Sequence, residues 1–210
     1  MLTKEYKILE LFARAPWNKY TFTDILNKLK LTSKSYLALT LKRLIDDAII
    51  KKELVGNLPI YSLNISSSKA RLYAGFVLEY VAWGRKNIPY TDIEKLIKKI
   101  PTKDFIFIIT GSYSQNKQTE KSDIDVVILV DNSVNVKTIY AELNQICELN
   151  IPLIHLYVFK NREFLEMLIN DDANYGKEIV RNNLVINGGQ IYLSLIYEAT
   201  RNGFTNKNTY

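Results

Sequence analysis

The spacing of hydrophobic residues predicts three short helices followed by a β-hairpin in residues 1–63. Within each predicted helix, apolar residues recur at intervals of three or four, as in a helix that buries one face. The first helix runs from Thr3 to Ala15 and ends at Pro16, because proline interrupts a helix. The second begins after Thr21, whose hydroxyl can cap the helix, with Asp24 three residues further on.

A third helix and a hairpin complete this part of the chain. Thr32 or Ser33 can cap the helix. Its apolar stripe consists of Leu37, Leu41, Leu44, Ile45 and Ala48. The segment IIKKELVGNLPIYSLN then alternates apolar and polar residues on both sides of Gly56 and Asn57, which predicts two strands joined by a tight turn.

This order of elements resembles a winged helix-turn-helix domain, which we expect over residues 1–65. The face of the third helix that does not pack carries cationic and hydroxyl side chains: Lys34, Ser35, Tyr36, Lys42 and Arg43. Such side chains suit contacts with the phosphates and base edges of double-stranded DNA. Domains of this kind also act as dimerisation or protein-interaction modules, so a protein partner is the alternative.

Beyond residue 65 the pattern predicts a helical linker and then a sheet. Helices are expected at residues 67–85 and 91–100, within a linker over residues 66–100. The first of them has an apolar stripe typical of a core or of a homodimer interface: Tyr73, Phe76, Val77, Tyr80 and Val81. From residue 101 onward, apolar strands alternate with helices, which predicts a mixed sheet with flanking helices. The expected fold class is therefore α+β.

The charge of the chain is unevenly distributed. The net charge is +6, and residues 1–63 contain 11 Lys and Arg against 6 Asp and Glu. The remaining residues are nearly balanced, with 17 against 16. This asymmetry favours an anionic partner for the N-terminal part, although a solvated surface would have the same composition.

Composition also limits the class of protein. A chain with 47% hydrophobic and 24% charged residues is typical of a globular protein and not of a disordered one. No run of about 18 apolar residues occurs, so we expect no membrane span and no signal peptide. The single cysteine, Cys147, excludes an internal disulfide and suits the cytoplasm. Its apolar neighbours favour a buried thiol over a nucleophile.

The most informative segment is GSYSQNKQTEKSDIDVVILV, residues 111–130. Gly111 and Ser112 follow a predicted strand, residues 104–110. Glycine permits a tight turn and a close approach of a ligand to the backbone. Ser112 is expected near a helix N-terminus, where N–H groups and a hydroxyl can hold a phosphate.

Asp123 and Asp125 add a second signal, because residues two apart in a strand project from the same face. At about 5 Å and an effective dielectric constant of about 20, their repulsion is about 3 kcal/mol. A divalent cation would turn this repulsion into attraction, and Mg²⁺ prefers oxygen ligands. Two solvated acids at the end of a strand are the alternative, which the Gly-Ser turn upstream argues against.

The segment resembles the Gly-Ser and Ser-Asp-x-Asp signature of the DNA polymerase β-like nucleotidyltransferase superfamily, and in particular its small prokaryotic domains. The resemblance covers about residues 104–189 and implies a nucleotidyltransferase domain over residues 101–210. It also implies that Gly111, Ser112 and Ser122 contact a nucleoside triphosphate. Asp123 and Asp125 would bind Mg²⁺ or Mn²⁺, and a nucleotidyl group would pass to an acceptor hydroxyl.

The chain departs from this pattern at two positions. The family supplies a third carboxylate from a later strand, where this chain has His155, its only histidine. His155 could be a substitute base or metal ligand, a relic in an inactive enzyme, or a core histidine. In the last case Glu148 and Glu163 are the nearest acids in sequence. Asn116 stands where the family has a second glycine, and asparagine tolerates positive φ well.

Two functions are therefore expected. The first is an enzyme with catalytic residues Asp123, Asp125 and His155 that transfers a nucleotidyl group to a protein or a small molecule. The second is a DNA-binding regulator, or an antitoxin-like partner of another protein, whose nucleotidyltransferase fold only senses nucleotide.

Overall fold

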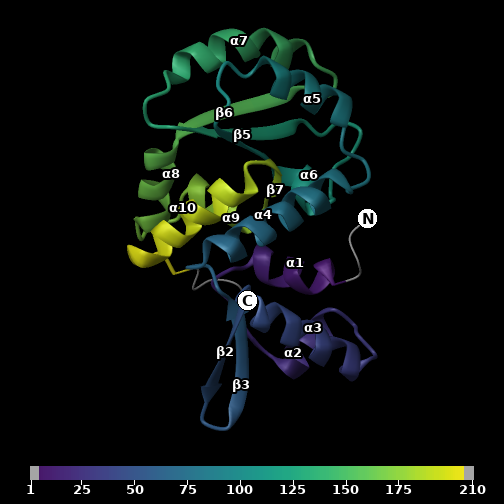
Figure 1. The fold of residues 1–210 in the computed structure, drawn as a ribbon. Helices are drawn as coiled ribbons and strands as arrows, with labels where there is room; N and C mark the ends of the chain where they lie inside the picture. The colour runs from purple at the N-terminus through teal and green to yellow at the C-terminus, as the bar shows by residue number, and fades with distance from the viewer. Residues whose placement is uncertain (1–4, 206–210) are drawn as a thin grey trace.

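The computed structural model describes residues 5–205 of the chain (Figure 1). Residues 5–63 contain the three helices and the hairpin expected there. Thr3, the predicted first residue of the first helix, lies outside the described residues. In order, the elements are α1 (Tyr6–Arg14), β1 (Lys19–Thr21), α2 (Phe22–Lys28), α3 (Lys34–Asp46), β2 (Ile50–Val55) and β3 (Leu58–Leu63). The strands form an antiparallel sheet in the order β1-β3-β2. The sequence pattern did not predict β1, since three residues are too few to show an alternation.

Local hydrogen bonds fix where α2 and α3 begin. At α2, Thr21 Oγ1 accepts from the N–H of Asp24 at 3.1 Å, and the N–H of Thr21 donates to Asp24 Oδ2 at 2.8 Å. This capping box satisfies two backbone donors that the helix leaves unpaired. At α3, Ser33 and not Thr32 is the cap, since Ser33 Oγ accepts from the N–H of Tyr36 at 3.2 Å.

The predicted stripe of α3 is wrong at its last position. The helix ends at Asp46, and Ala48 follows it as an exposed residue with φ of 55°. Its carbonyl instead accepts a hydrogen bond from the Asn64 side chain at 2.8 Å. Ala48 therefore belongs to the turn that leads into β2.

The C-terminal part is built around a second sheet. Its elements are α5 (Tyr90–Lys99), β4 (Phe105–Thr110), α6 (Gly111–Gln115), β5 (Ile124–Val130), α7 (Val136–Leu149), β6 (Ile154–Lys160), α8 (Asn161–Ile169), α9 (Tyr175–Arg181), β7 (Leu184–Asn187) and α10 (Gly189–Arg201). The strand order is β6-β5-β4-β7, with β5 and β6 parallel and β4 antiparallel to both β5 and β7. The fold is therefore α+β with a mixed sheet.

Helices cover both faces of this sheet. Residues of α5 and α7 pack on one face, and residues of α4 (Ser68–Trp83), α8, α9 and α10 pack on the other. Cys147 of α7 is 2% exposed, and burial raises the pKa of its thiol to about 11. The prediction of a buried thiol is confirmed. Within residues 5–205, no helix is long and apolar enough to cross a membrane.

As a core stripe, the prediction for α4 is wrong at two of its five positions, while a homodimer interface there remains a prediction. Tyr73 and Phe76 are 49% and 54% exposed, whereas small residues such as Ala74 and Gly75 face the core. The reason is a close helix crossing, because a Cβ on Gly75 would lie 2.4 Å from the backbone nitrogen of Gln190 in α10. Large side chains do not fit between helices at this distance.

α4 also joins the two parts of the chain. It packs against α1 on one side and against α10 and β7 on the other (Figure 1). One hydrophobic core therefore continues from Ile8 in α1 to Phe204 near the C-terminus. The domain boundaries expected at residues 65 and 100 remain predictions.

Candidate functional site

Three strands bring the predicted site residues together. In β5, Asp125 pairs with Thr110 at the end of β4 and with His155 at the beginning of β6. Asp123 immediately precedes β5, and its side chain is 43% exposed, against 30% for Asp125. The register thus places both carboxylates, the Gly-Ser turn and the only histidine at one end of the sheet.

Gly111 is in direct contact with one of the carboxylates. Its φ is +64°, and a Cβ built at this position would lie 2.1 Å from Asp125 Oδ2. Any other residue would be strained and would displace the acid. The absence of a side chain at Gly111 therefore allows the Asp125 carboxylate to approach the backbone of the turn closely.

The loop from α6 to β5 is closed by its own hydrogen bonds. Ser112 is half-buried in the first turn of the short helix α6, and Asn116 ends that helix with φ of 58°. Asparagine thus adopts the left-handed conformation, as expected from its tolerance of positive φ. Ser122 Oγ accepts from the N–H of Thr119 at 2.9 Å, which fixes the chain just before Asp123.

His155 faces both acids. Its Nε2 lies 3.7 Å from Asp123 Oδ2, and its Nδ1 lies 3.5 Å from Asp125 Oδ1. These separations are longer than well-formed hydrogen bonds, and the side chain is 47% exposed. The interpretation of His155 as a core histidine is therefore wrong. Its roles as base, ligand or relic stay open.

The two glutamates considered as alternatives differ in position. Glu163 Oε2 accepts from the backbone N–H of Lys160 at 2.7 Å, at the far end of β6. Seven residues of strand separate the two ends of β6 by about 20 Å, so Glu163 cannot complete the site. Glu148 is exposed on α7 and lines a shallow depression together with His155.

The donor set fits a cation that arrives with its substrate. Within residues 5–205, no cluster of three or more His, Cys, Asp and Glu side chains is arranged as a metal site. Mg²⁺, however, keeps several waters and is commonly held by one or two carboxylates together with substrate phosphates. Asp123 and Asp125 supply two such carboxylates, so the missing third acid does not exclude this mode of binding.

Two tyrosines beside this site were missed from the sequence. The rings of Tyr157 and Tyr175 lie 4.9 Å apart, and Tyr157 is 37% exposed. Burial raises the pKa of Tyr175 above its usual range, with Tyr157 and Asp125 adding to the effect. Tyr157 could have been found, because it follows His155 by two residues and so shares its face of β6.

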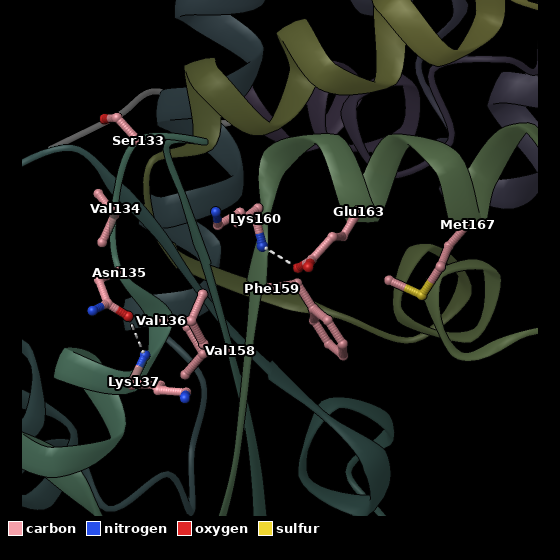
Figure 2. A pocket seen from close by; sticks show the side chains of 10 residues that line it. All are labelled: Ser133, Val134, Asn135, Val136, Lys137, Val158, Phe159, Lys160, Glu163 and Met167. Atoms are coloured by element: carbon pink, nitrogen blue, oxygen red, sulfur yellow. Dashed lines mark hydrogen bonds between the residues drawn. The ribbon is translucent and has the colours of Figure 1, made fainter.

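A larger cavity lies away from these residues. Its volume is about 780 Å³, and it lies where β6 ends and α7 and α8 begin (Figure 2). Lys160 and Glu163 line it, and Asn135 there accepts a hydrogen bond from the backbone N–H of Lys137. None of the predicted catalytic residues reaches it.

The predicted DNA-binding residues are exposed, apart from Tyr36. Lys34, Ser35 and Lys42 are exposed on α3. Tyr36 is half-buried, and its hydroxyl is enclosed without a hydrogen-bond partner among residues 5–205. Arg43 is also exposed, and its Nη1 pairs with Glu5 Oε1 at 2.7 Å in a surface ion pair.

Comparison with known families gives one match. Residues 92–183 match the family model described as "Polymerase beta, Nucleotidyltransferase", a range that contains every catalytic and nucleotide-binding residue predicted above. No curated protein and no solved structure matches the chain. The match supports the resemblance to the DNA polymerase β-like superfamily, and it identifies residues 92–183 as the nucleotidyltransferase-like part of the chain.

Proposed function

We propose that this protein binds a nucleoside triphosphate with Mg²⁺ or Mn²⁺ and transfers a nucleotidyl group to an acceptor hydroxyl, with pyrophosphate as the leaving group. The observation that carries the proposal is the meeting of Gly111, Asp125 and His155 at the ends of three strands. A backbone turn without a side chain, two carboxylates and a base are the groups that this chemistry needs.

Each residue has a role in this proposal. Asp123 and Asp125 hold the cation, which when bound offsets charge on the phosphates. The backbone at Gly111 and the hydroxyl of Ser112 contact the triphosphate, while Ser122 holds the loop that positions Asp123. His155 accepts the proton of the acceptor hydroxyl, since neutral imidazole is a general base.

Calorimetry of triphosphate binding tests the site. Asp123→Asn combined with Asp125→Asn should abolish the Mg²⁺-dependent part of binding, while removal of like-charge repulsion leaves the fold stable. Asp104→Asn is the matched control, because this exposed acid precedes β4 at the opposite end of the sheet. If the double variant binds the triphosphate as tightly as the wild type, the metal site is refuted.

A second proposed function is double-stranded DNA binding by a winged helix-turn-helix domain. It is supported by the order α1-β1-α2-α3-β2-β3, by the β1-β3-β2 sheet, and by the exposed Lys34, Ser35 and Lys42 on α3. In the alternative form of this proposal the protein is a regulator that senses nucleotide without turnover, and the imidazole in place of a third acid favours it.

A further inference from the structure

The nucleotidyltransferase-like part contains aromatic side chains that the proposed function does not use. Along β6, His155, Tyr157 and Phe159 project from one face of the strand, because residues two apart share a face. Tyr175, the first residue of α9, packs against this face. The centroid of the Tyr175 ring lies 4.9 Å from that of Tyr157 and 6.2 Å from that of Phe159. An aromatic cluster therefore begins next to the imidazole of the site.

Tyr157 is the exposed member of this cluster. It is 37% exposed, whereas Phe159 and Tyr175 are half-buried. Tyr175 meets the Tyr157 ring at an angle of 52° between the ring planes. This contact restricts the Tyr157 side chain, and a side chain that is already restricted loses less conformational entropy when a ligand packs on it. The ring is therefore both accessible and held in place.

The order of the strands gives the direction in which a bound nucleotide would lie. Gly111 follows β4, Asp125 lies in β5 between the other two strands, and His155 lies at the beginning of β6. In the proposed function, the triphosphate contacts the backbone at Gly111, and His155 accepts the proton of the hydroxyl that attacks the α-phosphate. The α-phosphate would therefore lie near β6, and the nucleoside attached to it would lie on the same side.

Tyr157 is within reach of that nucleoside. It follows His155 by two residues, which is about 7 Å along a strand. A nucleobase is separated from its α-phosphate by one ribose, which is a distance of the same order. Bases stack on aromatic side chains, and such contacts accept any base because every base has a π-face. The exposed ring thus lies where a base would need a partner.

We propose that Tyr157 stacks against the base of the bound nucleoside triphosphate and that Tyr175 holds the Tyr157 ring in position. This inference rests on the proposed function, since it requires the nucleotide to lie between Gly111 and His155. The base is a better partner than a ring of the acceptor, because its position is set by the α-phosphate, whereas the acceptor only has to bring a hydroxyl to His155. Purine triphosphates should bind more tightly than pyrimidine triphosphates, since the larger rings stack more strongly.

ATP and ribose 5-triphosphate are matched probes, because the second has a hydroxyl in place of the base. Affinities for both are measured by calorimetry with Mg²⁺ and the full chain. ATP should bind the wild type at least about fivefold more tightly, the lower range for the stacking of one base. Tyr157→Leu, which keeps an apolar side chain against Tyr175, should reduce this ratio to nearly one. Tyr157→Phe should preserve the ratio, since a phenyl ring still stacks.

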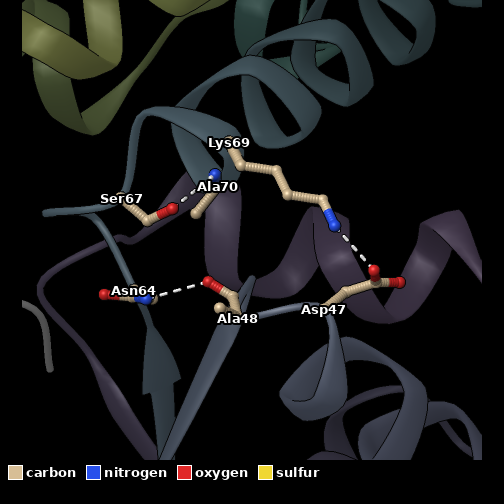
Figure 3. A network of polar contacts seen from close by, with 6 residues as sticks. All are labelled: Asp47, Ala48, Asn64, Ser67, Lys69 and Ala70. Atoms are coloured by element: carbon tan, nitrogen blue, oxygen red, sulfur yellow. Dashed lines mark hydrogen bonds and ion pairs between the residues drawn. The ribbon is translucent and has the colours of Figure 1, made fainter.

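Tyr73→Leu is the matched control, because Tyr73 is another exposed tyrosine and lies outside the site. It belongs to α4, where Lys69 Nζ lies 5.9 Å from the centroid of its ring. Lys69 also pairs with Asp47, the residue that follows α3, at 2.6 Å (Figure 3). Neither affinity should change in Tyr73→Leu.

Equal affinities of the wild type for ATP and ribose 5-triphosphate would overturn the inference, and this result does not depend on any variant. A ratio that persists in Tyr157→Leu would also overturn it, because the base would then bind elsewhere. A ratio lost in Tyr157→Phe would do so as well, since the hydroxyl and not the ring would be the partner. In each of these cases, Mg²⁺-dependent binding of ribose 5-triphosphate would leave the proposed triphosphate site intact. If neither ligand binds to the wild type, the proposed function fails together with the inference.

Discussion

At the scale of single residues, the candidate site consists of an imidazole that faces two carboxylates. His155 is within 3.7 Å of Asp123 and 3.5 Å of Asp125, and it is accessible to solvent. A histidine in this position can accept a proton from an acceptor, but it carries no negative charge to help hold a cation. The balance between these two properties decides whether the site turns over.

Substitution of His155 separates the interpretations. If imidazole is the base, His155→Ala should lower the rate of transfer about 10²-fold. The assay follows label from α-labelled triphosphates into acceptors of a cell extract, with Mg²⁺ or Mn²⁺. His155→Asp is the matched variant. The opposite result is a transfer rate above that of the wild type in His155→Asp, with little change in His155→Ala. It would show that the imidazole is a relic, and it would favour a regulator that senses nucleotide without turnover.

Cys147 offers a prediction about reactivity. Burial raises the pKa of its thiol to about 11, so the group is protonated at neutral pH, and the thiolate is the reactive form. Alkylation by iodoacetamide at about pH 8 should be at least tenfold slower in the native protein than after unfolding in denaturant. Equal rates, followed by mass spectrometry, would contradict the buried position.

At the scale of elements, the crossing of α4 and α10 is the most constrained contact. A Cβ on Gly75 would meet the backbone of Gln190 at 2.4 Å, and one on Gly189 would meet the carbonyl oxygen of Gly75 at 2.4 Å. The N–H of Gly189 also donates to Glu79 Oε1 at 2.6 Å. Both helices are therefore in backbone contact, and a side chain at either glycine would require one of them to shift.

Gly75→Ala should destabilise the protein by about 3 kcal/mol, the upper range for overpacking, since backbone atoms and not flexible side chains must move. Gly84→Ala, at the C-cap of the same helix, is the control, because its Cβ would lie 3.4 Å from the nearest atom. Denaturant unfolding measures both free energies. A loss below about 1 kcal/mol in Gly75→Ala would indicate that the helices are further apart.

The elements differ in how well their sequences predict them. The cap at Thr21 and the turn at Gly56 depend on neighbouring residues, and both were predicted. The placing of His155 beside Asp125 was expected only from the resemblance to the nucleotidyltransferase superfamily. The burial of α4 depends on how closely α10 approaches, which no local pattern contains. Arg43 is exposed on α3 as predicted, but its pairing with Glu5 was missed, because Glu5 is distant in sequence.

At the scale of the whole molecule, the surplus of positive charge in the N-terminal part leads to a prediction about salt. If α3 contacts phosphates, the affinity of the full chain for duplex DNA should fall steeply with salt. Lys34→Ala and Lys42→Ala should each reduce the slope of the log–log plot by about one. Arg43→Ala should reduce it less, because Arg43 is paired with Glu5.

Lys103→Ala, an exposed change before β4, is the control for net charge and should leave the slope nearly unchanged. Fluorescence anisotropy between about 50 and 200 mM salt gives the slopes. Absence of duplex binding by the full chain at about 50 mM salt would assign the N-terminal part to a protein partner.

Because α4 packs into the core on both sides, the proposed DNA surface and the proposed reaction centre are not connected by a tether. Their separation and relative orientation are set by one helix that contacts α1 at one side and α10 at the other. An acceptor that binds both sites at once would therefore have to bridge one fixed distance between the DNA surface and the reaction centre. Lengthening the chain near residue 65 would not extend the reach of the reaction centre along DNA, as it would for two domains on a flexible connection.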